Sequence, residues 1–135
     1  MKKQNVIAVI GCGNIANGAH FPALSAIKNV RIKYAVDLIK DRAENAREKY
    51  GCEQAIVDYK IALADPEVES VYVLTPPNYA HYTVTMYALN AGKHVFCEKA
   101  MAYTVDECKQ MYDVWKETGK VLYIGQQRLF DKKYI

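Results

Sequence analysis

A short segment near the amino terminus, VIAVIGCGNIA at residues 6–16, most constrains how this chain can fold. It opens with five apolar residues, a run too short for a helical core segment, which predicts a buried parallel strand. Gly11, Gly13 and Ala16 follow at the spacing GxGxxA, where a helix begins. Gly11 permits a tight turn, Gly13 leaves the backbone open to a pyrophosphate, and Ala16 lets helix and strand pack closely. The segment therefore predicts a turn that holds an anion on free amides at a helix N-terminus.

Size, charge and cysteine content narrow the class of protein. The 135 residues suffice for one domain with its own core. The net charge of +3 arises from basic residues scattered among acids, which does not favour nucleic-acid binding. The apolar run at 6–10 is too short for a signal peptide, so we expect a cytoplasmic protein that binds no membrane. The cysteines lack zinc-site spacing, so we expect no metal and small buried thiols; they are Cys12, Cys52, Cys97 and Cys108.

Strand and helix patterns alternate along the rest of the chain. Strands are predicted at 6–10, 31–36, 54–57, 70–74, 93–97 and 121–125. Helices are predicted from residue 14 to a break near Phe21, from Pro22 to 27, and at 41–50, 59–64, 78–90 and 105–118. Capping boxes are expected at Asp41 with Glu44 and at Thr104 with Glu107. The alternation predicts an α/β fold, a doubly wound, mostly parallel sheet of about six strands with helices on both faces, in the manner of a Rossmann fold.

Polar residues follow the predicted strands. In an open parallel sheet, ligands bind beyond the carboxyl ends of the strands, near the switch in strand order. Asp37 lies about 20 residues after the glycine turn, where a dinucleotide fold places the carboxylate that binds the adenosine ribose. The later strands are followed by TPPNYAH at 75–81, CEKAMA at 97–102, and the run Gln126, Gln127 and Arg128. We expect these segments to meet at one edge of the sheet.

Taken together, GCGNIA with AHFPAL, VLTPPNYAH and HVFCEKAMA resemble the N-terminal half of the Gfo/Idh/MocA oxidoreductases, relatives of glucose-fructose oxidoreductase and inositol dehydrogenase. The resemblance covers nearly all of residues 1–135. It implies an NAD(P)-binding Rossmann domain, followed in relatives by a substrate domain on an open antiparallel sheet. It further implies hydride transfer to or from a sugar, cyclitol or related polyol. One departure is Ala100, where the EKP motif of the family has proline, so the backbone of Lys99 is less restricted.

The same resemblance assigns roles to individual residues. Glu98 would help hold the cofactor, and Lys99 would be the catalytic residue that holds or relays the proton of the substrate hydroxyl. Structural alternatives stay open, because Lys99 could be an ordinary solvated lysine and His81 could merely occupy the first turn of a helix. His20 and His94 are expected to be packing or surface residues. The resemblance implies that the pyrophosphate is contacted by Gly11, Gly13, Asn14 and Ile15. It implies that Asp37 contacts the adenosine ribose. The part of the cofactor beyond the pyrophosphate would be lined by Thr75, Pro76, Asn78 and His81.

The sequence also leads to expectations about which dinucleotide binds and about whether residues 1–135 hold all of the enzyme. A carboxylate at Asp37 favours NAD over NADP, whose 2′-phosphate would meet like charge, although Lys40 and Arg42 lie nearby in sequence. The substrate domain is absent from residues 1–135, as in an excised domain or a truncated gene product. We therefore expect cofactor binding without useful turnover, and self-association through surface that a second domain would cover.

Two other functional classes share part of the pattern. A non-catalytic NAD-binding or redox-sensing module would keep the glycine turn and Asp37 without needing Glu98 and Lys99. A methyltransferase would also use a glycine-rich turn, but the GxGxxA spacing and the CEKAMA segment argue against it.

Overall fold

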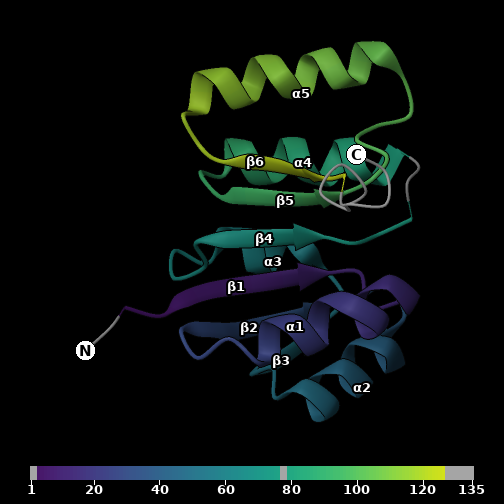
Figure 1. Ribbon diagram of the computed structural model, residues 1–135, viewed down its shortest axis with the longest axis vertical. Coiled ribbons are helices and arrows are strands. Elements are labelled where there is room, and N and C mark those ends of the chain that lie inside the picture. Colours follow the sequence, from purple (N-terminus) through teal and green to yellow (C-terminus); the bar gives the residue numbers. More distant parts are fainter. Residues whose placement is uncertain (1–2, 77–78, 127–135) are drawn as a thin grey trace, which may run out of the picture.

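Six parallel strands form a single sheet in the computed structural model, which describes residues 3–76 and 79–126 (Figure 1). Their order is β3-β2-β1-β4-β5-β6, and the order reverses between β1 and β4. The predicted doubly wound Rossmann sheet is thereby confirmed, and its switch point marks the edge where such sheets bind ligands. The strands are β1 (Asn5–Ile10), β2 (Val30–Val36), β3 (Gln54–Ile56), β4 (Ser70–Val73), β5 (His94–Glu98) and β6 (Leu122–Gly125).

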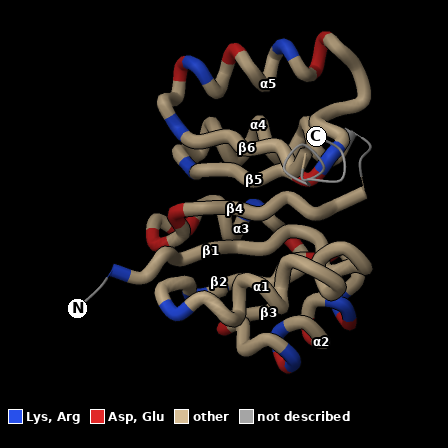
Figure 2. Tube along the Cα trace, viewed as in Figure 1, with Lys and Arg blue, Asp and Glu red and all other residues tan. Residues whose placement is uncertain are grey.

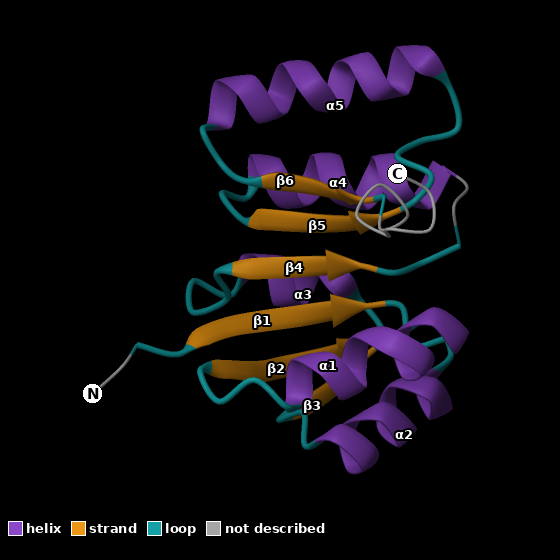
Figure 3. Cartoon of the chain, in the orientation of Figure 1, coloured by secondary structure: helices purple, strands orange, loops and turns teal. Residues whose placement is uncertain are grey.

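Helices cover both faces of the sheet, as Figure 3 shows. They are η1 (Ala16–His20), α1 (Phe21–Ser25), α2 (Lys40–Tyr50), α3 (Tyr59–Ala64), α4 (Tyr79–Asn90) and α5 (Val105–Thr118). Helices α1 and α2 pack on β1, β2 and β3 on one face, whereas α3 and α4 lie on the other face and α5 packs against α4.

Strand β1 belongs to two apolar cores because its side chains alternate between the faces. Ile7 and Val9 pack with Phe21 of α1, and all three are buried. Val6, Ala8 and Ile10 point to the opposite face, where they pack with Leu89 of α4 and residues of α3. A strand covered on both sides reads as a continuous apolar run, which is why the sequence carries VIAVI here. Three of the cysteines, Cys12, Cys52 and Cys97, are buried as predicted, and Cys108 is half-buried.

The helix after the glycine turn widens before it reaches α1. η1 is a π-helical turn, in which the Phe21 N–H donates to the Ala16 carbonyl oxygen five residues earlier. Pro22 follows in the first turn of α1 and has no N–H to continue an α-helical bond to the preceding turn. The predicted break near Phe21 is not found: His20 and Phe21 keep helical backbone angles, and the chain passes from η1 into α1 by a change of helical register instead. His20, the last residue of η1, packs against Tyr72 and Phe96 of the sheet.

The two predicted capping boxes have different outcomes. Thr104 and Glu107 form theirs at the start of α5. The box at Asp41 and Glu44 is wrong, because α2 begins at Lys40 with Ile39 as N-cap and no side chain caps it. Glu44 instead forms an ion pair with Arg47 one turn later, with 2.9 Å between Oε2 and Nε.

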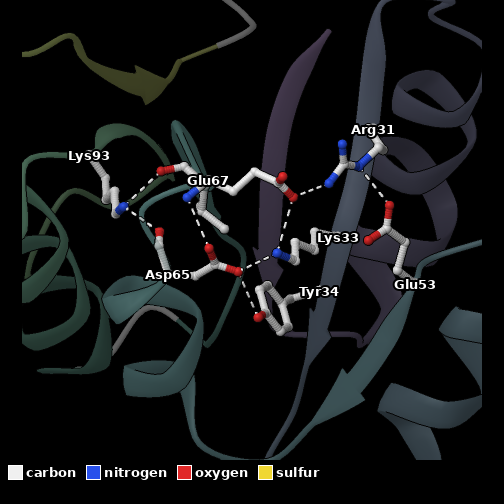
Figure 4. A network of polar contacts seen from close by, with 8 residues as sticks. Arg31, Lys33, Tyr34, Glu53, Asp65, Glu67 and Lys93 are labelled. Carbon is white, nitrogen blue, oxygen red and sulfur yellow. Dashed lines mark hydrogen bonds and ion pairs between the residues drawn. The ribbon is translucent and has the colours of Figure 1, made fainter.

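Charged residues lie mainly on helices and at strand ends, with both signs intermixed (Figure 2). One polar network joins the amino ends of β2 and β4, far from the switch-point edge (Figure 4). Lys33 Nζ lies 2.6 Å from Asp65 Oδ2 and 3.0 Å from Glu67 Oε1. The hydrogen bond from Lys33 lowers the pKa of the Asp65 carboxyl to about 2. The network also includes Arg31, Tyr34, Glu53 and Lys93.

None of the helices among residues 3–76 and 79–126 is both long and apolar enough to cross a membrane.

Candidate functional site

A cavity of about 710 Å³ opens beyond the carboxyl ends of β1, β4 and β5. It lies at the switch in strand order, where the topology predicts a ligand site. Most of the predicted site residues line it: Gly11, Gly13, Asn14, Ile15, Asp37, Thr75, Pro76, Glu98 and Lys99. Asn78, Gln127 and Arg128 lie outside the described residues, and Gln126 does not line the cavity.

The glycine turn forms one wall of the cavity, and its two glycines differ in what they need. Gly11 has φ of +102°, and a Cβ there would lie 2.7 Å from the carbonyl carbon of Leu74. Gly11 is therefore required by the fold, because it crosses directly over the chain leaving β4. Gly13 has no atom within 4 Å of an added Cβ. Its missing side chain leaves open space on the cavity wall, as a cradle for a phosphate group requires.

Two polar side chains hold the glycine turn in place. Asp37 Oδ2 accepts from the N–H of Cys12 at 2.9 Å, and Oδ1 accepts from the N–H of Ile39 at 2.8 Å. Asn17 donates its side-chain amide to the carbonyl oxygens of Cys12 and Gly13, at 2.9 and 2.8 Å. Asp37 thus ties the turn after β1 to the turn after β2. Asn17 was not predicted, although its place one helical turn after Gly13 is a recognisable signal.

Helix α2 adds a basic wall that the sequence analysis only partly anticipated. Arg42 lines the cavity as suggested, whereas Lys40 does not. Asn45 and Lys49, from the same helix, line it as well. Their spacing of three to four residues places Arg42, Asn45 and Lys49 on one face, so the helix presents two cations beside Asp37.

His81 lies beneath the cavity rather than on its wall. Its side chain is fully buried, with Nε2 2.6 Å from the carbonyl oxygen of Thr75 and Nδ1 2.6 Å from that of Ala100. The expectation that His81 lines the cofactor is replaced by a different geometry, in which it joins the segment after β4 to the segment after β5. The peptide bond between Lys99 and Ala100, just before the carbonyl group that His81 contacts, is cis.

Glu98 and Lys99 occupy the end of β5 but differ in exposure. Glu98 is 7% exposed; its Oε2 accepts from the backbone N–H of Lys99 at 3.0 Å, and its Oε1 lies 2.9 Å from Nε2 of His20. Lys99 is exposed at the mouth of the cavity. His20 packs edge-on against Tyr72 and Phe96, as a packing residue is expected to do, and in addition it contacts Glu98 of the site. His94 lies at the other end of β5, where its Nδ1 accepts from the N–H of Val121.

The cysteine in the glycine turn is not poised to react. Burial raises the pKa of the Cys12 thiol to about 12, and the nearby Asp37 charge adds to the rise. The thiol therefore stays protonated at neutral pH, and a protonated thiol is a poor nucleophile and a poor metal ligand. No cluster of three or more metal-ligating side chains occurs within the described part of the chain.

The cavity has the features that a nicotinamide dinucleotide requires. Gly13 leaves open space on the cavity wall, and the Asp37 carboxylate lines the same cavity. Thr75 Oγ1 is buried at the cavity wall with no hydrogen-bond partner among residues 3–76 and 79–126. A buried hydroxyl without a partner is uncommon, and a bound ligand would supply one.

Comparisons with known proteins agree with this geometry. Residues 6–126 match the sequence profile of the Gfo/Idh/MocA group, described as "Oxidoreductase family, NAD-binding Rossmann fold". An inositol 2-dehydrogenase from Salmonella paratyphi B is 33% identical over 129 residues, which cover 94% of this chain and 38% of the relative. A myo-inositol 2-dehydrogenase from Thermotoga maritima is also 33% identical, over 95% of this chain and 38% of its own. The chain thus spans about 38% of the length of these relatives.

Solved structures show the same likeness. A 3-ketoreductase from Actinomadura kijaniata, crystallised with NADP, superposes with a TM-score of 0.89 at 29% identity, over 98% of this chain and 42% of its own. An NAD-binding protein from Listeria innocua gives a TM-score of 0.85 at 30% identity, over 96% of this chain and 36% of its own. The matched segment spans the glycine turn, the strands that follow it and the segments that line the cavity. The chain belongs to the Gfo/Idh/MocA oxidoreductase family and comprises its NAD-binding Rossmann fold.

Proposed function

We propose that this chain is the cofactor-binding part of a nicotinamide-dependent oxidoreductase that acts on a sugar, cyclitol or related polyol. One observation carries the proposal: a single cavity unites the open glycine turn, a carboxylate placed for a ribose, and the Glu98–Lys99 pair. A non-catalytic module would need only the first two features. The inositol dehydrogenases among the relatives support a polyol as the substrate class.

Each part of the cavity has a role in binding the dinucleotide. The glycine turn offers free amides at the start of a helix to the pyrophosphate, near Gly13, Asn14 and Ile15. Asp37 accepts from the adenosine ribose with lone pairs that its two backbone contacts leave free. Thr75 and Pro76 line the far part, where Thr75 Oγ1 finds the partner it lacks. His81 fixes the two loops from below and is a positioning residue in this scheme.

The chemistry of the reaction explains the pair at the end of β5. When bound, the nicotinamide supplies the group that accepts or returns a hydride. As the hydride leaves the carbinol carbon, the hydroxyl proton must leave too, and Lys99 is placed to hold or relay it. Lys99 is exposed, so it depends on the bound cofactor and substrate for the desolvation that would tune its basicity.

NAD is the cofactor that the site favours over NADP. Asp37 is proposed to bind the adenosine ribose, and its charge would repel a 2′-phosphate. Arg42 and Lys49 on α2 face the same cavity and reduce this repulsion. We therefore expect preference for NAD without complete exclusion of NADP, in keeping with the NADP found in the Actinomadura relative.

The test is a titration of the 135-residue chain with NADH, followed by the fluorescence of the nicotinamide. We expect saturable binding that S-adenosylmethionine does not displace; displacement would instead support a methyltransferase. Incubation with NAD and a panel of polyols should give no sustained NADH formation from this chain alone. Absence of NADH binding would refute the proposal.

A further inference from the structure

The contact between His20 and Glu98 is not explained by the roles assigned so far. We propose that His20 is a positioning residue: as an imidazolium it holds the Glu98 carboxylate and offsets its charge, so that NADH binds more tightly as pH falls. The inference rests on the proposed function, because Glu98 lines the cavity proposed for the cofactor. Nε2 of His20 lies 2.9 Å from Oε1 of Glu98, and the two side chains are 16% and 9% exposed.

The fold directs His20 at Glu98 across a long sequence distance. The two residues are 78 positions apart and belong to η1 and β5. His20 ends the same helical segment whose first residues form the glycine turn, and the π-helical register before Pro22 sets its direction. π-turns of this kind occur often at functional sites. The contact therefore joins the segment proposed for the pyrophosphate to the segment proposed for hydride transfer.

The surroundings of the pair are apolar and leave Glu98 little freedom. The His20 ring lies edge-on to Phe96 and Tyr72, with centroids 5.1 and 6.2 Å apart. A Cβ on Gly125 would lie 3.3 Å from the carboxyl carbon of Glu98, so the glycine in β6 makes room for this carboxylate. The low exposure of both side chains strengthens the attraction between imidazolium and carboxylate.

The titratable groups around His20 leave Glu98 as its charged partner. Glu98 comes from β5, Tyr72 from β4 and Tyr123 from β6, and the last lines a small cleft together with His20. Burial raises the pKa of Tyr72, which keeps that phenol neutral. Lys99 contributes its backbone N–H to the other oxygen of Glu98.

The sign of the pH effect follows from the charges in the cavity. Asp37 and Glu98 both line it, and NADH brings two phosphate charges of the same sign. With His20 neutral, the charge of Glu98 opposes the cofactor. Protonation of His20 cancels that charge, so affinity for NADH rises as pH falls through the range where histidines titrate, roughly pH 5 to 8. A bound cofactor in turn favours the protonated ring.

The test measures the Kd of NADH between pH 5.5 and 8 for the wild-type chain, His20→Gln, Glu98→Gln and the double variant. We expect the wild-type Kd to rise about fivefold across this range, the scale of one partly buried ion pair. In His20→Gln the pH dependence should disappear, with affinity near the high-pH wild-type value. The double variant should bind no more weakly than Glu98→Gln. His94→Gln, at the opposite end of β5, is the control and should keep the wild-type profile.

Two results would overturn the inference alone. One is a wild-type pH profile in His20→Gln, and the other is a loss of thermal stability in His20→Gln with no change in NADH affinity, which marks a purely structural contact. Loss of NADH binding by the wild-type chain would overturn the proposed function as well. The pair is also testable without cofactor: the ¹⁵N resonances of the His20 ring should shift in Glu98→Gln, and unchanged resonances would contradict the contact.

Discussion

Replacing each of the two glycines of the turn by alanine separates what the fold needs from what the ligand needs. In Gly11→Ala, the new Cβ would lie 2.7 to 2.8 Å from backbone atoms of Leu74 and Thr75, and φ stays at +102°. The strained backbone costs about 1 to 3 kcal/mol, and the overlap with a backbone that cannot rotate away costs about 1 to 3 kcal/mol more. We expect the free energy of unfolding to fall by about 2 to 6 kcal/mol.

Gly13→Ala should behave in the opposite way. Its Cβ meets no atom within 4 Å, and its backbone lies outside the left-handed region, so stability should change by less than about 0.5 kcal/mol. The methyl group would occupy the space proposed for the pyrophosphate. A steric cost of about 1 to 3 kcal/mol there corresponds to a loss of NADH affinity of roughly 5-fold to more than 100-fold.

Urea denaturation followed by circular dichroism measures the first effect, and NADH fluorescence titration measures the second. With a typical dependence of about 2 kcal/mol per molar urea, the Gly11→Ala midpoint should fall by roughly 1 to 3 M. The reasoning is refuted if Gly13→Ala binds NADH as tightly as wild type, or if Gly11→Ala unfolds at the wild-type urea concentration.

Three further predictions concern other parts of the molecule. Asp37→Asn should weaken NADH binding about tenfold and reduce the preference over NADPH, because one amide oxygen replaces two carboxylate oxygens that hold the turn; paired titrations with an unchanged ratio would contradict this. Asp65, whose pKa is lowered to about 2 by Lys33, stabilises the fold above pH 4 and loses that contribution as pH falls toward 2. Lys33→Met should flatten this dependence in urea titrations at several pH values, and an unchanged slope would count against the pairing. Thr104→Ala should lower the free energy of unfolding by about 1 kcal/mol without altering the Kd of NADH, whereas Thr104→Ser should restore it.

Local sequence signals predicted most of the architecture. The apolar run at 6–10 and the glycine spacing each depend on contacts between near neighbours in the chain, and the structure confirms the strand and the turn that they predict, whereas Pro22 changes the helical register without breaking the helix. The predicted capping box at Asp41 and Glu44 is wrong because other contacts between near neighbours form in its place. Glu44 pairs with Arg47 one turn along, and Asp37 accepts the N–H of Ile39 at the entry to α2.

The site was only partly predictable for a physical reason. Residues that follow strands could be assigned to one edge of the sheet, since the carboxyl ends of parallel strands meet there. The direction of each side chain depends on packing between distant segments, which residue spacing does not encode. His81 therefore lies beneath the cavity, although the sequence suggested that it lines the cofactor, and the contact of His20 with Glu98 could not be read from their spacing of 78 residues.

The network around Arg31, Lys33, Asp65 and Glu67 lies at the amino ends of the strands, whereas the cavity lies at their carboxyl ends. We expect substitutions at the amino ends of the strands to change the resistance of the fold to acid or heat without reaching the cavity at the carboxyl ends. Stability lost at the amino ends can then be regained by a second substitution there, while the cavity stays intact. The residues at the carboxyl ends of the strands are then free to accumulate changes in cofactor or substrate preference. The amino ends are the place where a designer would first add stability.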